Sequence, residues 1–159
     1  MRTIFDANYI DLLKLLNKKK AKFVLVGGLA VVVHGIYRTT KDMDIFYDGT
    51  KENSTKVLDA INVFGFSSLN LTVNDLMDPD GYIQLGHEPV RIDLFNSLPG
   101  LEFNEVYEEA FLHEEDGLKF KVIHINHLIK NKNTVGRLQD LDDAKKLQKL
   151  LAKKEKKNK

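Results

Sequence analysis

Asp42 and Asp44 are the residues whose types and spacing point most directly to chemistry. They lie in residues 42–47 (DMDIFY), where a strand would place both carboxylates on one face because side chains alternate along a strand. Two carboxylates so close together repel each other unless a cation neutralises them. Magnesium and manganese prefer hard oxygen ligands of this kind, so the pair predicts a divalent-metal site.

A third carboxylate, Asp93, would complete a two-metal centre. It lies in residues 90–95 (VRIDLF), which are typical of a strand whose Val90, Ile92 and Leu94 face inward. An Asp-x-Asp pair alone is a weak motif that also occurs in solvated strands and turns. The metal-site prediction therefore depends on this later strand and on a glycine turn that precedes Asp42.

That turn is Gly27-Gly28, which follows a short apolar run at residues 23–26 and precedes another at residues 29–33. The pattern predicts a strand, a tight turn and a buried helix. Glycines let a backbone approach a ligand closely, and the amide groups that begin a helix favour phosphate. Without the carboxylates, the same pair would indicate only turn geometry.

Arg38 and Lys41 lie just before the aspartate strand, where either could contact phosphate oxygens. Each could equally be an exposed loop charge, and the sequence leaves both interpretations open. His34 lies in a largely apolar helical segment, so we interpret it as a partly buried histidine with its hydrogen bond satisfied rather than as a catalytic group.

Helices and strands must alternate along the chain to position these residues. An N-cap at Asp6 and apolar residues at helical spacing predict a first helix that ends near residues 17–20. Residues 82–85 should form a hairpin with the Asp93 strand. The other expected helices are residues 54–64, 103–110, 126–131 and 138–151, and the other expected strands are residues 111–115 and 118–123. These elements indicate an α/β (α+β) fold, with residues 69–80 as its least regular part.

The glycine pair, the Asp42-Met43-Asp44-Ile45 segment and the later Asp93 together resemble the nucleotidyltransferase superfamily, which has a polymerase-beta-like fold. Within it, the chain is similar to a small branch that includes abortive-infection nucleotidyltransferase toxins and antibiotic nucleotidyltransferases. The similarity to this branch extends to Ala30, His34-Gly35, Arg38, Thr39-Thr40, Leu128, Lys132, Gly136-Arg137, Asp140, Asp143 and Leu147. The resemblance implies a small mixed sheet flanked by helices, followed by a C-terminal helical segment.

The resemblance also implies roles for individual residues. Asp42, Asp44 and Asp93 would be the catalytic and metal-binding residues, holding two magnesium ions about 4 Å apart, with manganese as an alternative. One ion would bind the triphosphate, and the other, which Asp93 ligates, would activate the acceptor hydroxyl.

Gly27, Gly28, Arg38, Lys132 and Arg137 would bind the nucleotide. Many members of the superfamily carry serine where this chain has Gly28, so only backbone amides remain for phosphate at that position. Lys132 and Arg137 could neutralise the triphosphate. The alternative is a helix-end cation for Lys132 and a cap contact for Arg137.

The implied function is transfer of a nucleoside monophosphate from a nucleoside triphosphate, such as ATP, to an acceptor hydroxyl. Relatives use RNA ends such as that of tRNA, small molecules such as antibiotics, or protein side chains as acceptors, and the sequence selects none of them. A toxin of a toxin–antitoxin pair, with an antitoxin protein as partner, is one biological setting. The alternatives are a non-catalytic nucleotide- or RNA-binding module and a pure interaction protein.

Composition limits the classes of protein to which the chain could belong. Its 159 residues are the size of one domain, and it has no cysteine, which excludes disulfides and thiolate chemistry. We expect one nucleotidyltransferase-like domain over residues 1–152, with a core at 1–100 and a strand–helix extension at 101–152. No apolar run is long enough to cross a membrane, so the expected location is the cytoplasm. The basic tail, residues 153–159, is expected to fray, and it is either solubilising surface or a contact for RNA.

Overall fold

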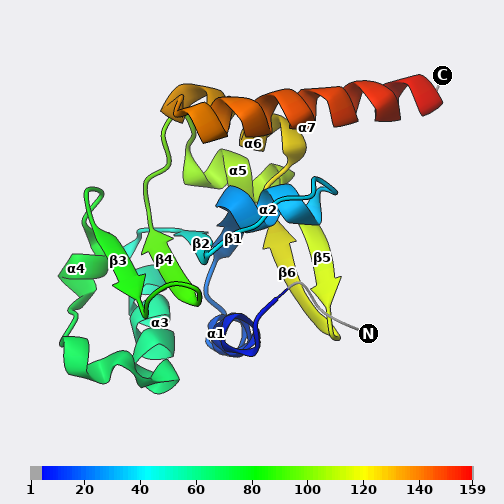
Figure 1. Ribbon diagram of the computed structural model, residues 1–159. Helices are drawn as coiled ribbons and strands as arrows, with labels where there is room; N and C mark the ends of the chain where they lie inside the picture. Colours follow the sequence, from blue (N-terminus) through cyan, green and yellow to red (C-terminus); the bar gives the residue numbers. More distant parts are fainter. Residues whose placement is uncertain (1–4, 159) are drawn as a thin grey trace.

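A six-stranded mixed sheet forms the centre of the computed structural model, which describes residues 5–158 (Figure 1). The strand order is β3-β4-β2-β1-β6-β5. The strands are β1 (Phe23–Val26), β2 (Asp42–Tyr47), β3 (Tyr82–Leu85), β4 (Arg91–Phe95), β5 (Phe111–Glu115) and β6 (Leu118–Val122). The nucleotidyltransferase-like arrangement of a mixed sheet with flanking helices is therefore present.

The pairing of β2 with β4 is the part of the topology that matters most for function. These strands are parallel, and their register places Asp44 opposite Asp93 and Asp42 opposite Arg91. On its other edge β2 pairs antiparallel with β1, which places Val26 opposite Asp44. The end of β1 and both aspartates of β2 consequently lie side by side with Asp93.

Seven α-helices surround the sheet in the described chain. They are α1 (Ala7–Lys18), α2 (Gly27–Val33), α3 (Lys51–Ile61), α4 (Val73–Met77), α5 (Phe103–Glu109), α6 (Ile125–Val135) and α7 (Leu138–Lys157). Helices α1 and α3 pack against each other and the sheet, whereas α6 and α7 form a separate pair. In Figure 1 α7 crosses the end of the molecule opposite α1, close to α2.

Burial of apolar side chains explains this arrangement. All four residues of β1 are buried, as expected for a central strand covered on both faces. Helix α1 buries one apolar stripe, and Asp6 caps it by accepting a hydrogen bond from the backbone amide of Asn8. Strand β2 alternates at its start, so Met43 is buried while Asp42 and Asp44 remain partly accessible.

Most of the expected elements are confirmed, with a few differences. The second helix begins at Lys51 rather than residue 54, because Thr50 caps it, and it ends in a π-helical turn containing Gly65. The segment at residues 69–80 contains α4, which a reciprocal capping box between Thr72 and Asp75 stabilises. Val90, expected to face inward on the Asp93 strand, precedes β4 and is only half-buried.

The C-terminal part of the chain is more closely joined to the rest than the expected extension implied. Strand β6 pairs parallel with β1, so residues beyond position 100 complete the central sheet. Helix α7 continues to Lys157, which is beyond the expected start of the basic tail at residue 153. No helix within residues 5–158 is both long and apolar enough to cross a membrane.

Candidate active site

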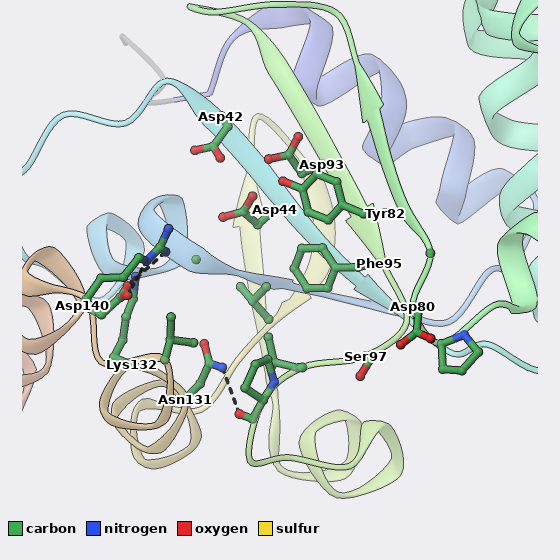
Figure 2. A pocket seen from close by; sticks show the side chains of 18 of the residues that line it. Asp42, Asp44, Asp80, Tyr82, Asp93, Phe95, Ser97, Asn131, Lys132 and Asp140 are labelled. Carbon is green, nitrogen blue, oxygen red and sulfur yellow. Dashed lines mark hydrogen bonds and ion pairs between the residues drawn. The ribbon is translucent and has the colours of Figure 1, made fainter.

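Three carboxylates meet where β2 and β4 lie side by side. Asp42, Asp44 and Asp93 each offer an oxygen atom, and these atoms all lie within 4.8 Å of one another. Figure 2 shows the three side chains directed toward a common space. Asp93 is 1% exposed, whereas the other two are partly accessible. The predicted metal ligands are thus brought together, in a geometry and with donor atoms that fit a divalent cation.

Gly27 joins β1 to α2 directly beside these carboxylates. Its φ of 71° lies in the left-handed region, and a Cβ at this position would come 2.0 Å from Oδ2 of Asp44. Gly28 is buried, and a Cβ there would come 3.2 Å from the guanidinium carbon of Arg38 and from Oγ1 of Thr40. The glycine pair therefore makes room for the side chains of Asp44, Arg38 and Thr40, a reason that the sequence did not reveal.

Repulsion within the cluster affects the protonation of its members. Burial, followed by the charges of Asp42 and Asp93, raises the pKa of Asp44 to about 8. Burial also raises the pKa of Asp93, although hydrogen bonds with Tyr82 and Arg91 oppose the rise. Such a site favours either a bound proton or a cation, as the sequence predicted from the carboxylate spacing.

Arg91 is a residue of the site that the sequence analysis did not select. Its Nε donates to Oδ1 of Asp93 at 3.1 Å, and its Nη2 donates to Oδ2 of Asp42 and Oδ2 of Asp93, each at 3.1 Å. The available signal was its position two residues before Asp93, which puts both side chains on one face of β4. Arg91 connects the carboxylates of the two strands.

The three cations predicted to bind nucleotide take part in one ion-pair network. Lys132 Nζ lies 3.2 Å from Oδ1 of Asp140 and 3.2 Å from Oδ2 of Asp143. Arg38 pairs with Asp143, and Nε of Arg137 lies 2.7 Å from Oδ2 of Asp140. Lys132, Asp140 and Asp143 are all buried. The network ties α6 and α7 to the loop that precedes β2.

The network changes the interpretation of several side chains. Lys132 lies in the last turn of α6, as the helix-end alternative expected, and it is buried as an ion-pair partner of Asp140 and Asp143. Lys41 is exposed, and its Nζ lies 3.6 Å from Oε2 of Glu88, so it forms a surface ion pair. His34 is half-buried, and its Nε2 makes a 2.8 Å hydrogen bond with the carbonyl oxygen of Ile123, which confirms the structural interpretation of this residue.

Two cavities of about 470 Å³ each adjoin the carboxylates. The residues common to both linings are Asp42, Asp44, Lys132, Arg137 and Asp140. The first cavity adds Asp93, Arg91 and an apolar group that includes Tyr82 and Phe95. The second adds Gly28, Arg38, Lys41 and the two threonines between them. The site thus has an aromatic cavity and a polar cavity, with Asp42 and Asp44 between them. The polar cavity is lined by four cations (Arg38, Lys41, Lys132 and Arg137) and four carboxylates, and we call it the basic cavity for those cations.

Comparison with solved structures relates this arrangement to a known fold. The lincomycin-bound crystal structure of the lincosamide antibiotic adenylyltransferase LnuA superposes with a TM-score of 0.57 at 15% sequence identity. The likeness covers 94% of this chain and 99% of the LnuA chain, and it shows that the two share a fold. A comparison with curated proteins gave no match.

A family model gives the closer relationship, because it covers almost the whole sequence. The model describes a nucleotidyl transferase of unknown function, DUF2204, and it matches residues 6–158. The match includes both aspartates of β2, Asp93 and the ion-pair network of α6 and α7. The chain therefore belongs to the DUF2204 family of nucleotidyltransferases.

Proposed function

We propose that the protein transfers a nucleoside monophosphate from a nucleoside triphosphate to an acceptor hydroxyl in a metal-dependent reaction. The oxygen of the acceptor forms a bond to the α-phosphorus, the bond from that phosphorus to the pyrophosphate breaks, and the hydroxyl proton leaves. The observation that carries the proposal is the convergence of Asp42, Asp44 and Asp93 between a basic and an aromatic cavity. A non-catalytic binding module would have no need of the third carboxylate.

Asp42, Asp44 and Asp93 would hold magnesium, with two ions as the expected number and manganese as an alternative. The fit is chemical as well as geometric, because all three offer hard oxygen donors and their mutual repulsion is relieved by a cation. Bound magnesium would neutralise the triphosphate and lower the pKa of the acceptor hydroxyl. Asp93, which lines only the aromatic cavity, would then accept the proton of that hydroxyl.

The basic cavity is the proposed site of the triphosphate. Gly28 presents backbone without a side chain there, and Arg38, Lys132 and Arg137 contribute positive charge. Because Asp140 and Asp143 already pair with these cations, they hold the three side chains in place before the nucleotide arrives. A preorganised set of donors stabilises charge on the transferred group better than flexible surface lysines would.

The similarity to LnuA makes ATP and a small-molecule hydroxyl the first substrates to test, since LnuA is an adenylyltransferase of a lincosamide antibiotic. We place the reaction in the cytoplasm, where nucleoside triphosphates are supplied. The comparisons give no support to an RNA acceptor, a toxin role or an antitoxin partner.

The test is incubation of the purified protein with magnesium and each labelled nucleoside triphosphate, offering RNA and a panel of small hydroxyl compounds separately. We expect label transfer that requires magnesium and disappears in a double Asp42→Asn, Asp44→Asn variant. Asp59→Asn, at an exposed position of α3, is the control and should retain activity. Normal transfer by the double variant would refute the site, and metal-dependent triphosphate binding without any transfer would favour the binding module.

A further inference from the structure

The two cavities beside the carboxylates have different linings. If the proposed function holds, one cavity would bind the triphosphate and the other the acceptor. Asp93 lines only the first cavity, whereas Gly28 and Arg38 line only the second. If the triphosphate occupies the basic cavity, the cavity that contains Asp93 remains for the acceptor. The lining of this acceptor cavity therefore carries information about the chemistry of the acceptor.

An aromatic stack forms one wall of the acceptor cavity. Tyr82 of β3 and Phe95 of β4 are cross-strand neighbours whose ring planes are 2° apart, with centroids separated by 6.0 Å. Tyr82 is 57% exposed, and both rings lie beside Asp93 and Asp44 in Figure 2. Such a surface binds a ring or another flat apolar group by stacking, close to where the hydroxyl would react.

Leu98, Pro99 and Val135 add further apolar surface to the same cavity. Its volume of about 470 Å³ lies within the range usual for sites that enclose a drug-sized molecule. A partly enclosed space of this size, with an aromatic wall and charged groups around it, fits a compact molecule better than an extended polymer.

Asp80 is the carboxylate in this lining that neither the proposed metal site nor an ion pair of the described residues neutralises. Of the other four, Asp42, Asp44 and Asp93 would bind magnesium, and Asp140 pairs with Lys132 and Arg137. Asp80 lies at this cavity, and within residues 5–158 no basic side chain is within ion-pair distance of its carboxylate. In Figure 2 Asp80 lies beyond Phe95, on the side away from the three metal-site carboxylates.

We propose that the acceptor is a small hydroxyl compound with a ring that stacks on Tyr82 and a protonated amine that pairs with Asp80. The ring and the amine would orient the molecule so that its hydroxyl lies at Asp93 and attacks the α-phosphorus, with the proton passing to Asp93. An RNA end that brought a phosphate toward the carboxylate of Asp80 would be repelled by it, which costs binding energy.

The first experiment measures binding in the absence of nucleotide. Tryptophanol carries an indole ring, an amine and a hydroxyl, and tryptophol lacks the amine together with the carbon that bears it. Since the chain has no tryptophan, the indole emission of either probe is free of protein background. We expect Tyr82→Ala to weaken tryptophanol binding about tenfold, because it removes the stacking face. Asp80→Asn should weaken tryptophanol binding but leave tryptophol binding unchanged.

Two variants serve as controls for this binding experiment. Tyr82→Phe keeps the ring and should retain most of the affinity. Tyr37→Ala removes a tyrosine that is 96% exposed and lines neither cavity, so it should bind both probes like the unmodified protein. No binding of tryptophanol to the unmodified protein, or binding that is indifferent to Tyr82→Ala, would overturn the proposal.

The second experiment compares turnover of labelled ATP and magnesium with tryptophanol, lincomycin and a short RNA with a free 3′ hydroxyl. We expect label on the small amines, with KM raised by Tyr82→Ala while ATP binding is unaffected. Faster labelling of the RNA would overturn the acceptor class, and weaker ATP binding in Tyr82→Ala would show that the stack holds the nucleobase instead. Failure of the unmodified protein to bind any of the nucleoside triphosphates with magnesium would refute the proposed function, independently of the tryptophanol result.

Discussion

The carboxylate of Asp44 lies directly against the backbone of Gly27, since a Cβ at residue 27 would come 2.0 Å from Oδ2 of Asp44. The φ of 71° at the same residue is a second reason for glycine, because side chains disfavour this conformation. The turn after β1 and the Asp44 side chain are therefore fitted to each other. Any side chain at residue 27 must displace the carboxylate, the backbone or both.

Gly27→Ala should consequently abolish or strongly reduce nucleotidyl transfer by displacing Asp44. The left-handed conformation alone should cost about 1–2 kcal/mol of unfolding free energy. Gly117→Ala is a matched control, because Gly117 has a φ of 80° and open space around its α-carbon. Denaturation and activity assays should show a similar stability loss from backbone conformation in both variants but loss of activity only in Gly27→Ala. Equal activities would contradict the steric explanation.

The sequence predicted the local part of this site well. Alternation along a strand was sufficient to put Asp42 and Asp44 on one face, and that face is the accessible one. The proximity of Asp93 depends on the parallel register of β2 and β4, which no local pattern determines. Its assignment as a third ligand rested on the strand pattern of residues 90–95 and on the resemblance to the superfamily, and neither of these gave the register that places it opposite Asp44.

Local sequence patterns could not predict the ion-pair network either, because the network joins residues that are far apart in the sequence. Arg38 and Asp143 are 105 positions apart, and they meet only because α7 packs across the end of the molecule near α2. Asp140 and Asp143 matched the branch's C-terminal segment, but only the structure shows them as buried partners of Arg38, Lys132 and Arg137.

Asp143→Ala should destabilise the protein far more than Asp142→Ala. Removing one partner of a buried ion pair typically costs about 3–5 kcal/mol, and we expect the lower end because Lys132 keeps Asp140. Asp142 is exposed, and its ion pair among residues 5–158 is with Lys146 on the surface of α7, so its replacement should cost less than about 1 kcal/mol. Urea unfolding of both variants measures the difference. Similar losses of unfolding free energy in the two variants would mean that the buried network contributes little to stability.

Without metal, Asp44 should make the protein less stable as pH rises. Its pKa is raised from 3.8 to about 8 on folding, so the folded state holds a proton that the unfolded state has lost. The resulting stabilisation is fully present below the unfolded pKa of 3.8 and is lost as pH rises through about 8. The Asp44→Asn variant has no titratable group at this position, so it should lack this pH-dependent stabilisation.

Denaturant unfolding in EDTA from about pH 5 to about pH 9 checks the expectation, with the difference between the unmodified protein and Asp44→Asn as the readout. The unmodified protein should lose stability relative to the variant across this range. Saturating magnesium should reverse the trend, because metal binding requires the ionised carboxylate and strengthens with pH. A difference that is constant with pH would show that Asp44 is already ionised in the metal-free protein.

Asp93→Asn should separate nucleotide binding from chemistry. Asp93 lines the acceptor cavity but not the basic cavity, so its variant should bind magnesium and triphosphate nearly as well as the unmodified protein. The amide oxygen can still accept a hydrogen bond from Arg91, which keeps β4 in place. Turnover should fall by about 10²–10⁴-fold, the usual loss for removing a general base. Titration of magnesium and triphosphate, followed by a single-turnover assay, measures both quantities, and a loss of nucleotide affinity as large as that of Asp44→Asn would show that the two carboxylates share one role.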